Sequence, residues 1–370
     1  MSKNYFFFIT CLEAGGAQRA MLQLIRHIKK VESYANIHVI NLSQEGEELQ
    51  ESLYSYSTSL INLNLKNFSF FKIYSLIKLI RDNHQKSILI GWMYHAGVVA
   101  WFCSLFAKKI PLVFSIHHSG LDSKNLSIRT LFVAYFMGLI SLSKRVKKIF
   151  FCAESSLNAH VNARYPKKKS IIIFNGVEKV KYQPALRIEK KQIFKIVMAA
   201  RFDPIKNHEN LFAAIKTIKN NIPISLSLFG EKITNDNEDL KVLIKKYSLK
   251  QEIKLEGVDP MLRDKFSNYD LLALPSNSEA FPLVIPEAMI SGLPCVASSV
   301  GDVPSIIGEY GWLVSPKDST ELSFAITEAY NAWLDKEKWV ILQANCRKRI
   351  EENFSSQKFC EAYYDSLSSL

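Results

Sequence analysis

Short apolar runs alternate with longer segments of helical period along most of the chain. In the first half the apolar runs are YFFFI, NIHVINL, ILIGW, LVFSI, KIFFC and SIIIF, and the helical segment AQRAMLQLIRHIKK follows the first of them. Continuous apolar runs are typical of strands buried on both faces, and a helix usually connects two parallel strands. The pattern therefore predicts an α/β fold with a doubly wound parallel sheet.

The alternation stops near residue 178 and then restarts. Residues 178–192 (EKVKYQPALRIEKKQ) are polar, contain a proline and have no apolar period, so we interpret them as a linker. Beyond them come FKIVMAA, SLSLFG, IKLEGV, DLLALP and PCVAS, with helices expected at about 207–219 and 285–291. We predict two Rossmann-like domains, residues 1–185 and 186–354, that face a central cleft because ligands bind at the carboxyl ends of such strands.

Two apolar segments need to be distinguished from membrane spans. Residues 87–107 are 21 residues without Asp, Glu, Lys or Arg, which is long enough to span, but they divide into a strand, a turn at His95 and Gly97, and a helix. Residues 128–143 are apolar over only 16 residues, which suits either a core helix or a helix lying on a bilayer surface. The segment YFFFI near the start is a strand rather than a signal peptide.

Composition and motifs remove several classes of protein. With 48% apolar and 22% charged residues the chain is globular, and its six scattered cysteines contain no Cys-x-x-Cys pair, so we expect reduced thiols. The loops G-x-x-x-x-G-K-[ST] and G-x-G-x-x-G are absent, as are H-E-x-x-H, G-x-S-x-G and Asp-x-Asp. ATP hydrolysis, nicotinamide chemistry, zinc or serine hydrolysis and a metal-held diphosphate therefore lack their usual motifs.

The positive charge is concentrated in one half of the chain. The net charge is +12, but residues 1–185 hold 24 basic and 10 acidic residues, which leaves the rest of the chain at −2. Such asymmetry indicates a polyanion or an anionic membrane surface as partner, or else a solvated lysine-rich face. Two runs contribute most visibly: Lys144, Arg145, Lys147 and Lys148, and then Lys167, Lys168 and Lys169.

Glycines and charged residues follow five of the predicted strands. Glycines allow backbone amides to approach a phosphate, an Arg and a Lys can neutralise a diphosphate, and carboxylates accept hydrogen bonds from sugar hydroxyls. The sequence therefore predicts a site for a sugar nucleotide. Its candidate residues are Gly15 and Gly16, His117 and His118, Arg201 and Lys206, Gly230 and Glu231, and Glu279 and Glu287.

At these residues the chain resembles the family 4 glycosyltransferases of the GT-B fold over nearly its whole length. The most specific match is the segment in which Glu279 and Glu287 stand eight apart before Gly292-Leu293-Pro294. Supporting matches are ARFDPIKNH at 200–208, the GGAQR loop, NGV at 175–177, GDVPSII from Gly301 and GWLVSPKD from Gly311. The resemblance implies retaining transfer from a nucleoside diphosphate sugar without a metal or other cofactor, and residues 355–370 packing back on the first domain.

The resemblance also implies roles for single residues. Arg201 and Lys206 would bind the diphosphate, Glu287 the nucleotide ribose and Glu279 the hydroxyls of the sugar. Alternatively, Glu279 is a surface loop residue and Glu287 is an acid favoured in the first turn of a helix. His117 would lie beside the sugar, with His118 as its competitor. The candidate catalytic residues are thus His117, Arg201, Lys206 and Glu279. The other donor-binding candidates are Gly15, Gly16, Glu231, Glu287 and the segment Ala280, Phe281, Pro282, Leu283 and Val284, whose amides would face the leaving phosphate.

The expected substrate class follows from the charge and the resemblance together. We expect a hexosyl- or N-acetylhexosaminyl-transferase that takes a UDP-linked sugar and acts on a glycan or lipid-linked acceptor at an anionic membrane, on the cytoplasmic face of the inner membrane. The alternatives are a transferase with a soluble acceptor and a sugar-nucleotide 2-epimerase of the same fold. Nucleic acid is not an expected partner.

Overall fold

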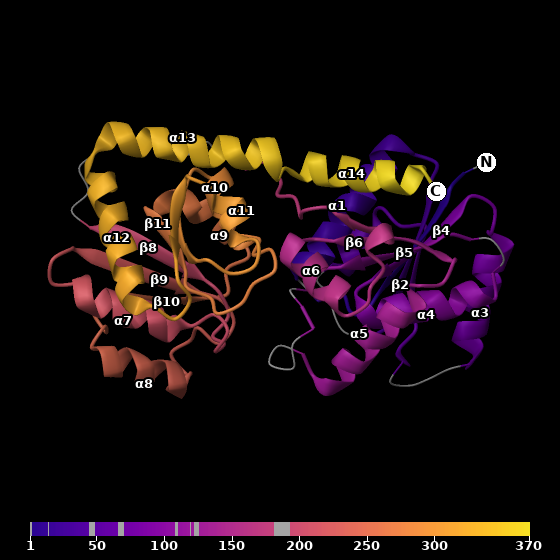
Figure 1. Cartoon of the computed structure of the whole chain (residues 1–370), viewed down its shortest axis with the longest axis horizontal. Helices are drawn as coiled ribbons and strands as arrows, with labels where there is room; N and C mark the ends of the chain where they lie inside the picture. Colours follow the sequence, from indigo (N-terminus) through magenta and orange to yellow (C-terminus); the bar gives the residue numbers. More distant parts are fainter. Residues whose placement is uncertain are drawn as a thin grey trace. The chain divides into compact units, whose positions relative to one another are not determined.

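The chain forms two compact units. The structure, a computed structural model, describes residues 2–13, 15–43, 49–65, 70–107, 110–118, 120–121, 126–180 and 193–370. The first unit contains residues 1–176 and 356–370, and the second contains residues 177–355 (Figure 1). The expected boundary at 185/186 and most of the expected linker fall in 181–192, outside the described residues; residues 177–180 and Ser355 belong to the second unit.

The first unit is built on a seven-stranded sheet in the order β3-β2-β1-β4-β5-β6-β7, and every neighbouring pair is parallel. The order reverses between β1 and β4, which is the switch point of a doubly wound sheet. The strands are β1 Asn4–Ile9, β2 Asn36–Asn41, β3 Ser59–Asn62, β4 Ser87–Trp92, β5 Leu112–Ile116, β6 Val146–Phe151 and β7 Ser170–Ile172.

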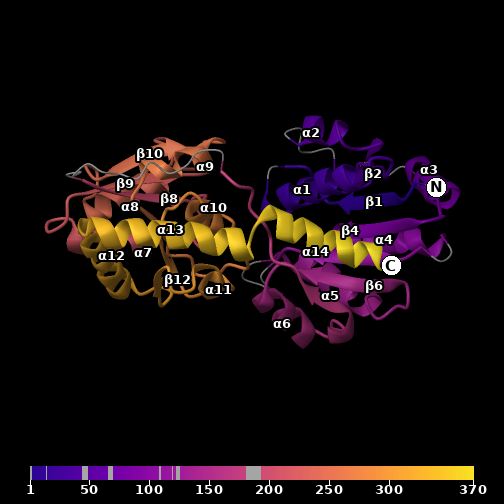
Figure 2. The same ribbon diagram turned by 90° about the horizontal axis from the view of Figure 1, so that it is seen from above.

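Helices cover both faces of this sheet. Phe7 and Trp92 pack with α1 and α14 on one face, whereas Phe8 and Phe114 pack with α3, α4 and α5 on the other. Figure 2 shows α14, the last helix of the chain, lying along the first unit. The helices are α1 Gly16–Val31, α2 Gln50–Tyr54, α3 Phe70–Asp82, α4 Tyr94–Leu105, α5 Ile128–Ile140, α6 Glu154–Asn162, the 3-10 turn η2 Lys167–Lys169, and α14 Ser356–Ser368.

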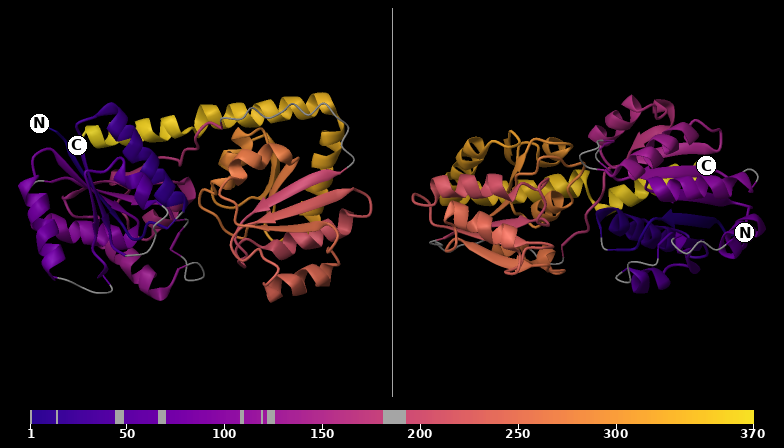
Figure 3. Two further views of the ribbon diagram at one scale, coloured as in Figure 1. Left: turned by 180° about the vertical axis from the view of Figure 1, so that it is seen from behind. Right: turned by 90° about the horizontal axis from the view of Figure 1, so that it is seen from below.

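The second unit repeats the plan with six parallel strands in the order β10-β9-β8-β11-β12-β13. The two sheets and their helical layers are seen from behind and below in Figure 3. The strands are β8 Phe194–Ala199, β9 Ile224–Phe229, β10 Ile253–Gly257, β11 Leu271–Leu274, β12 Cys295–Ser298 and β13 Gly311–Val314. The helices are α7 His208–Ile218, α8 Glu238–Tyr247, α9 Leu262–Lys265, the 3-10 turn η3 Phe266–Asn268, α10 Val284–Ile290, α11 Val303–Ile307, α12 Ser319–Leu334 and α13 Lys336–Asn353.

The structure confirms the predicted pair of Rossmann-like domains and the return of the final helix to the first one. The apolar segment 87–107 is a strand followed by the 12-residue helix α4, although His95 and Gly97 lie within that helix and not in a turn. Within the described part of the chain, no helix has the length and apolar character needed to cross a bilayer. All six cysteines are free.

Candidate functional site

Arg201 and Lys206 lie on the loop that joins β8 to α7. Asp203 and Lys206 close a β-turn, in which the Lys206 N–H donates to the Asp203 carbonyl oxygen at 2.9 Å and Pro204 occupies the position that favours proline. The Asp203 side chain reinforces the turn, since its Oδ1 accepts from the Ile205 N–H at 2.8 Å. The sequence Asp-Pro-Ile-Lys thus shapes this loop locally.

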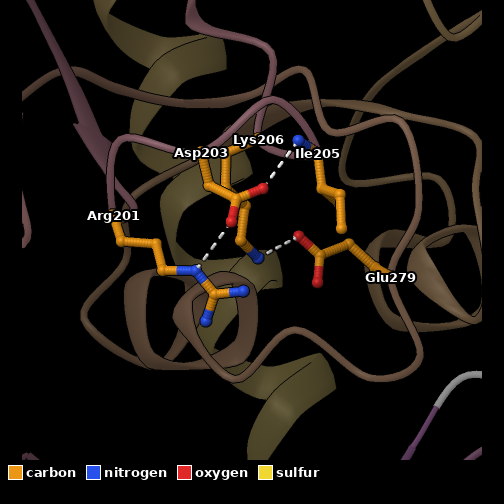
Figure 4. Close-up of polar contacts among 5 residues, drawn as sticks. All are labelled: Arg201, Asp203, Ile205, Lys206 and Glu279. Atoms are coloured by element: carbon orange, nitrogen blue, oxygen red, sulfur yellow. Dashed lines mark hydrogen bonds and ion pairs between the residues drawn. The ribbon is translucent and has the colours of Figure 1, made fainter. Parts of the chain in front are cut away.

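Each cation of the loop is paired with a carboxylate (Figure 4). Arg201 Nε lies 3.2 Å from Asp203 Oδ2, and Lys206 Nζ lies 2.6 Å from Glu279 Oε1. The Lys206 and Glu279 side chains are only 21% and 10% exposed, whereas Arg201 is 56% exposed. The structure therefore brings together Arg201, Lys206 and Glu279 as expected, and adds Asp203, which the sequence did not single out.

The charge of Asp203 is favoured by its surroundings. Burial by itself raises the pKa of this carboxyl, but the hydrogen bond from Ile205 and the positive charges of Arg201 and Lys206 outweigh it, so the pKa is lowered. Asp203 is accordingly ionised at neutral pH. The four charged groups of the two ion pairs sum to zero.

Asn277 ties this loop to the neighbouring strand. It follows β11, which lies beside β8 at the switch point of the second sheet. Its N–H donates to Ile205 O at 2.7 Å, its Nδ2 to Pro204 O at 3.0 Å, and its Oδ1 accepts from Asn207 at 3.0 Å. Asn207 itself is in the left-handed conformation (φ 54°), which asparagine tolerates better than most residues. Asn277 thus holds the backbone on both sides of Lys206, and Glu279 follows Asn277 by two residues. One hydrogen-bond network therefore positions both members of the ion pair.

Gly301 fixes the backbone on the other side of Glu279. Its φ is +55°, and a Cβ placed there would lie 2.1 Å from the Glu279 carbonyl oxygen. The next residue, Asp302, donates its N–H to Ala280 O at 3.0 Å. Position 301 thus needs a glycine for two reasons: a side chain there would clash with the Glu279 backbone, and the backbone has a positive φ.

The remaining candidates of the second unit have less defined surroundings. Glu231 is exposed, and its contact with the Arg201 loop is through its backbone, whose carbonyl accepts from the Phe202 N–H at 2.9 Å. Glu287 is half-buried in the first turn of α10. In the Ala280–Val284 segment Phe281 and Pro282 are buried, and Pro282 has no amide hydrogen to offer a phosphate.

His117 lies at the carboxyl end of β5 in the first unit. Its Nε2 is 2.8 Å from Ser115 Oγ, which is in turn 2.6 Å from the hydroxyl of Tyr363 on α14. The ring stacks on Trp92 with centroids 4.7 Å apart. Burial lowers the pKa of His117 to about 4, although Asn175 opposes the shift. His117 is therefore neutral at pH 7. Its Nδ1 and Asn175 Oδ1 are buried and, apart from the interaction between these two side chains, form no hydrogen bond among the described residues.

Trp92 links His117 to the glycine loop. Its indole Nε1 donates to Ala17 O at 2.9 Å, in the first turn of α1. Gly15 caps that helix and Gly16 begins it. Gly15, Gly16 and His117 thus come together at the carboxyl ends of β1, β4 and β5, through a tryptophan that the sequence had suggested only as part of a buried strand.

The competing residue His118 faces other helices. Its Nδ1 lies 3.1 Å from Gly120 O, its carbonyl accepts from Ser156 on α6, and its ring is 6.2 Å from that of Tyr94 on α4. The two adjacent histidines therefore contact different layers of the first unit. Only His117 shares a partner with the glycine loop.

One cavity of about 680 Å³ opens in the first unit, and none of the predicted site residues lines it. Its walls are formed by Gly120, Leu121, Tyr135, Ala159, Asn162, Ala163 and Arg164. Over the described ranges, no three His, Cys, Asp or Glu side chains gather in a group that could hold a metal ion.

Two family profiles match successive parts of the chain. Residues 14–180 match the profile described as Glycosyltransferase Family 4, and residues 180–352 match that of Glycosyl transferases group 1. A UDP-Gal:alpha-D-GlcNAc-diphosphoundecaprenol alpha-1,3-galactosyltransferase of Escherichia coli is 30% identical over 93% of this chain and 91% of its own length. An N-acetyl-alpha-D-glucosaminyl L-malate synthase of Bacillus anthracis is 25% identical, but the match spans only 46% of this chain and 45% of that one.

Solved structures share the architecture. Anabaena Alr3699/HepE, crystallised with UDP and glucose, superimposes with a TM-score of 0.80 and 19% identity, covering the whole of both chains. At this identity the likeness concerns the fold, which is the two-domain GT-B arrangement.

Proposed function

Because the chain belongs to the family 4 glycosyltransferases, we propose that it moves a sugar from a UDP-linked donor to a hydroxyl of a lipid-linked or membrane-associated glycan, with retention of configuration and without a metal. The name of the Escherichia coli relative supports both halves of the proposal, since that enzyme uses UDP-Gal and an acceptor on diphosphoundecaprenol. The net charge of +12 in the protein supports a site of action at the anionic cytoplasmic face of the inner membrane.

The observation that carries the donor assignment is the pair formed by Lys206 and Glu279. The Lys206 ammonium group has hydrogens that are not engaged by Glu279 and can bind a phosphate. The terminal guanidinium nitrogens of Arg201 point away from Asp203 (Figure 4). These donors are held in place before any ligand arrives, which is the arrangement that stabilises a leaving diphosphate most effectively. Glu279 then accepts hydrogen bonds from the sugar hydroxyls.

The transfer needs no protein nucleophile. The acceptor oxygen forms a bond to the anomeric carbon on the side from which the diphosphate departs, and the bond between that carbon and the phosphate oxygen breaks. The electron pair of the broken bond stays with the diphosphate, which takes up the proton of the acceptor hydroxyl. Arg201 and Lys206 stabilise the negative charge that develops on the diphosphate, the part that a metal ion plays in other enzymes.

Other residues serve binding in this proposal. Glu287 holds the nucleotide ribose, while the glycine loop at Gly15 and Gly16 and the amides of Ala280, Phe281, Leu283 and Val284 face the phosphates and the sugar. His117 is neutral at pH 7, because burial lowers its pKa to about 4, so it contributes a hydrogen bond to the donor rather than a positive charge.

A panel of nucleotide sugars tests the donor. A ligand at ~100 times its dissociation constant stabilises the folded protein by ~2.7 kcal/mol, which a thermal shift detects. The stabilising donor is then incubated with a short diphosphate-lipid glycan, and the anomeric configuration of the product is read by NMR. An inverted product, or epimerisation of the sugar nucleotide in the absence of acceptor, would reject the proposal.

Chelation tests the absence of a metal. We expect full activity in excess EDTA, because charged side chains replace the metal at the diphosphate. A hundredfold loss that manganese or magnesium restores would contradict this part of the proposal.

A further inference from the structure

The outward face of α5 is apolar along its whole length. Its inner side carries Ala134 and Met137, which are buried against the sheet. Its outer side carries large side chains at steps of four, three, four and three residues, a single helical face. Their exposed fractions are high: Ile128 84%, Phe132 74%, Tyr135 52%, Leu139 64% and, just past the helix, Leu142 57%. A helix that is apolar all round is expected to be covered on both sides.

The end of α4 extends this surface. α4 and α5 pack side by side on the same face of the first sheet, and the rings of Trp101 and Phe136 meet edge to face with centroids 6.1 Å apart. On α4 the side chains of Phe102, Leu105 and Phe106 are 42%, 41% and 50% exposed. We call these residues and the five on α5 the α4–α5 face. Exposed apolar side chains gathered on two adjacent helices are typical of an interaction site on a soluble protein.

Basic residues border one end of the α4–α5 face. The exposed side chain of Lys144 lies just past the end of α5, and that of Lys147 lies at the start of β6. Lys169 Nζ lies 2.9 Å from Ser141 O and 2.8 Å from Ser143 O, so the run that includes the exposed Lys167 and Lys168 lies at the same helix end. The sequence has no Asp or Glu between residues 123 and 153.

Three other members of the basic runs are engaged in the fold. Arg145 donates to the carbonyl oxygens of Ser104 and Ala107 at the end of α4, Lys148 donates to Ser366 O near the end of α14, and Lys169 caps α5 as described. Cations commonly occupy these positions because the last carbonyls of a helix lack partners. Within the two basic runs, the described structure shows no partner for Lys144, Lys147, Lys167 and Lys168.

From this arrangement we propose that the α4–α5 face enters the headgroup region of an anionic bilayer, with its apolar side chains below the phosphates and the four free lysines at the phosphates. α5 spans ~20 Å at 1.5 Å per residue, and apolar residues occur along all of it, so the helix lies parallel to the membrane. Burial of the apolar side chains does not depend on salt, whereas lysine attraction does. Membrane association therefore has a salt-resistant part.

A lipid surface fits the face better than a second copy of the chain. A symmetric dimer through this face would bring the same patch of each copy together. Residues 87–107 and 123–153 contain no Asp or Glu, so neither copy would offer the lysines an acidic partner, whereas anionic headgroups neutralise them. Binding through this face would bring the enzyme to a membrane-borne acceptor. Its biological role therefore rests on the proposed function.

Co-sedimentation with vesicles of phosphatidylglycerol and phosphatidylcholine tests the inference on the full chain. We expect wild-type protein to bind, and high salt to release only part of it. Phe132→Ser with Leu139→Ser should weaken binding about tenfold or more and abolish the salt-resistant part. Lys144→Glu with Lys147→Glu should abolish the salt-sensitive part. The matched control is Phe324→Ser, a similarly exposed phenylalanine (67%) on α12 of the second unit.

Insertion can be observed directly with a polarity-sensitive label on Phe132→Cys, which should shift to shorter wavelength on vesicles, while Phe324→Cys should not. Complete release of wild type by salt, an unchanged Phe132→Ser/Leu139→Ser variant, or a wild-type dimer that this variant dissociates would each overturn the inference. Nucleotide-sugar binding, measured by thermal shift without lipid, tests the proposed function separately, so a failure of one is distinguishable from a failure of the other.

Discussion

The two units share one topology but differ in what they place at their surfaces. Counted over the residues of each unit, the first carries a net charge of +12 and the second a net charge of zero. The first unit exposes the α4–α5 face and stacks the ring of His117 on Trp92. The second holds its candidate site through ion pairs and a hydrogen-bonded turn. The sheet order therefore does not determine the chemistry, which depends on strand-end loops and outward helix faces.

The strongest test of this division is to remove one cation from the second unit. Arg201→Ala or Lys206→Ala should lower kcat/KM by ~100- to 1,000-fold, because each withdraws positive charge from the leaving diphosphate, at a cost of ~3 to 4 kcal/mol. Vesicle binding through the first unit should be unchanged. The measurement is steady-state kinetics together with co-sedimentation.

A matched control for these variants is Lys246→Ala, which removes another lysine–carboxylate pair of the second unit, also at 2.6 Å but more exposed. Its activity should equal that of the wild type. If Arg201→Ala and Lys206→Ala were both fully active, the donor site would have to be sought elsewhere.

Acid should destabilise both units through buried histidines, of which His117 and His160 lie in the first unit and His208 in the second. Burial lowers the pKa of His160 in the first unit and of His208 in the second from 6.5 to about 4. His160 accepts from Tyr94 and donates to Ser156 O, so its neutral form is the bonded one. The unfolded chain therefore takes up protons first, and stability present above pH 6.5 is lost as the pH falls toward 4, by at most about 3 kcal/mol per histidine.

Urea unfolding at pH 7.5 and 4.5 measures this loss. His160→Gln and His208→Gln should each flatten the pH dependence, even where they lower stability at neutral pH. An equally steep dependence in both variants would show that other groups, such as carboxylates, dominate the acid response.

A smaller effect is expected from Gly301→Ala in the second unit. The new Cβ would meet the Glu279 carbonyl and the backbone would keep an unfavourable positive φ, so we expect a loss of about 1 to 3 kcal/mol of stability and reduced activity through displaced Glu279. Thermal unfolding and kinetics measure the two effects. Alanine at Gly120, where the nearest atom would be 3.4 Å away, is the control and should be nearly neutral.

The smallest effect concerns Asp203, which positions Arg201 without being expected to touch the donor. Asp203→Asn keeps a hydrogen-bond acceptor for Ile205 but removes the charge beside Arg201. We expect KM for the donor to change by less than about tenfold with little change in kcat, since an exposed ion pair contributes ~1 kcal/mol or less. A loss of kcat as large as that of Arg201→Ala would mean that Asp203 acts in the chemistry itself.

The sequence predicted the sheets well because their strands are buried on both sides and therefore continuously apolar. It missed β3 and β13, whose segments SLIN and GWLV have only one buried residue between them. It singled out Arg201, Lys206 and Glu279, which lie together in the structure, because a strand end and a motif mark them; their roles stay predictions. It could not identify the pairing of Asp203 with Arg201, which depends on side-chain conformation, or the role of Tyr363, which reaches Ser115 from 248 residues away.

The position of α14 has a consequence for the order in which the chain can fold during synthesis. Phe359, Tyr363 and Leu367 are buried in the core of the first unit, although they are translated after the whole of the second unit. The second unit, residues 177–355, is continuous and can be completed before α14 has left the ribosome. The N-terminal unit must wait, so a nascent chain or a product truncated before residue 356 lacks the tyrosine behind Ser115 and His117.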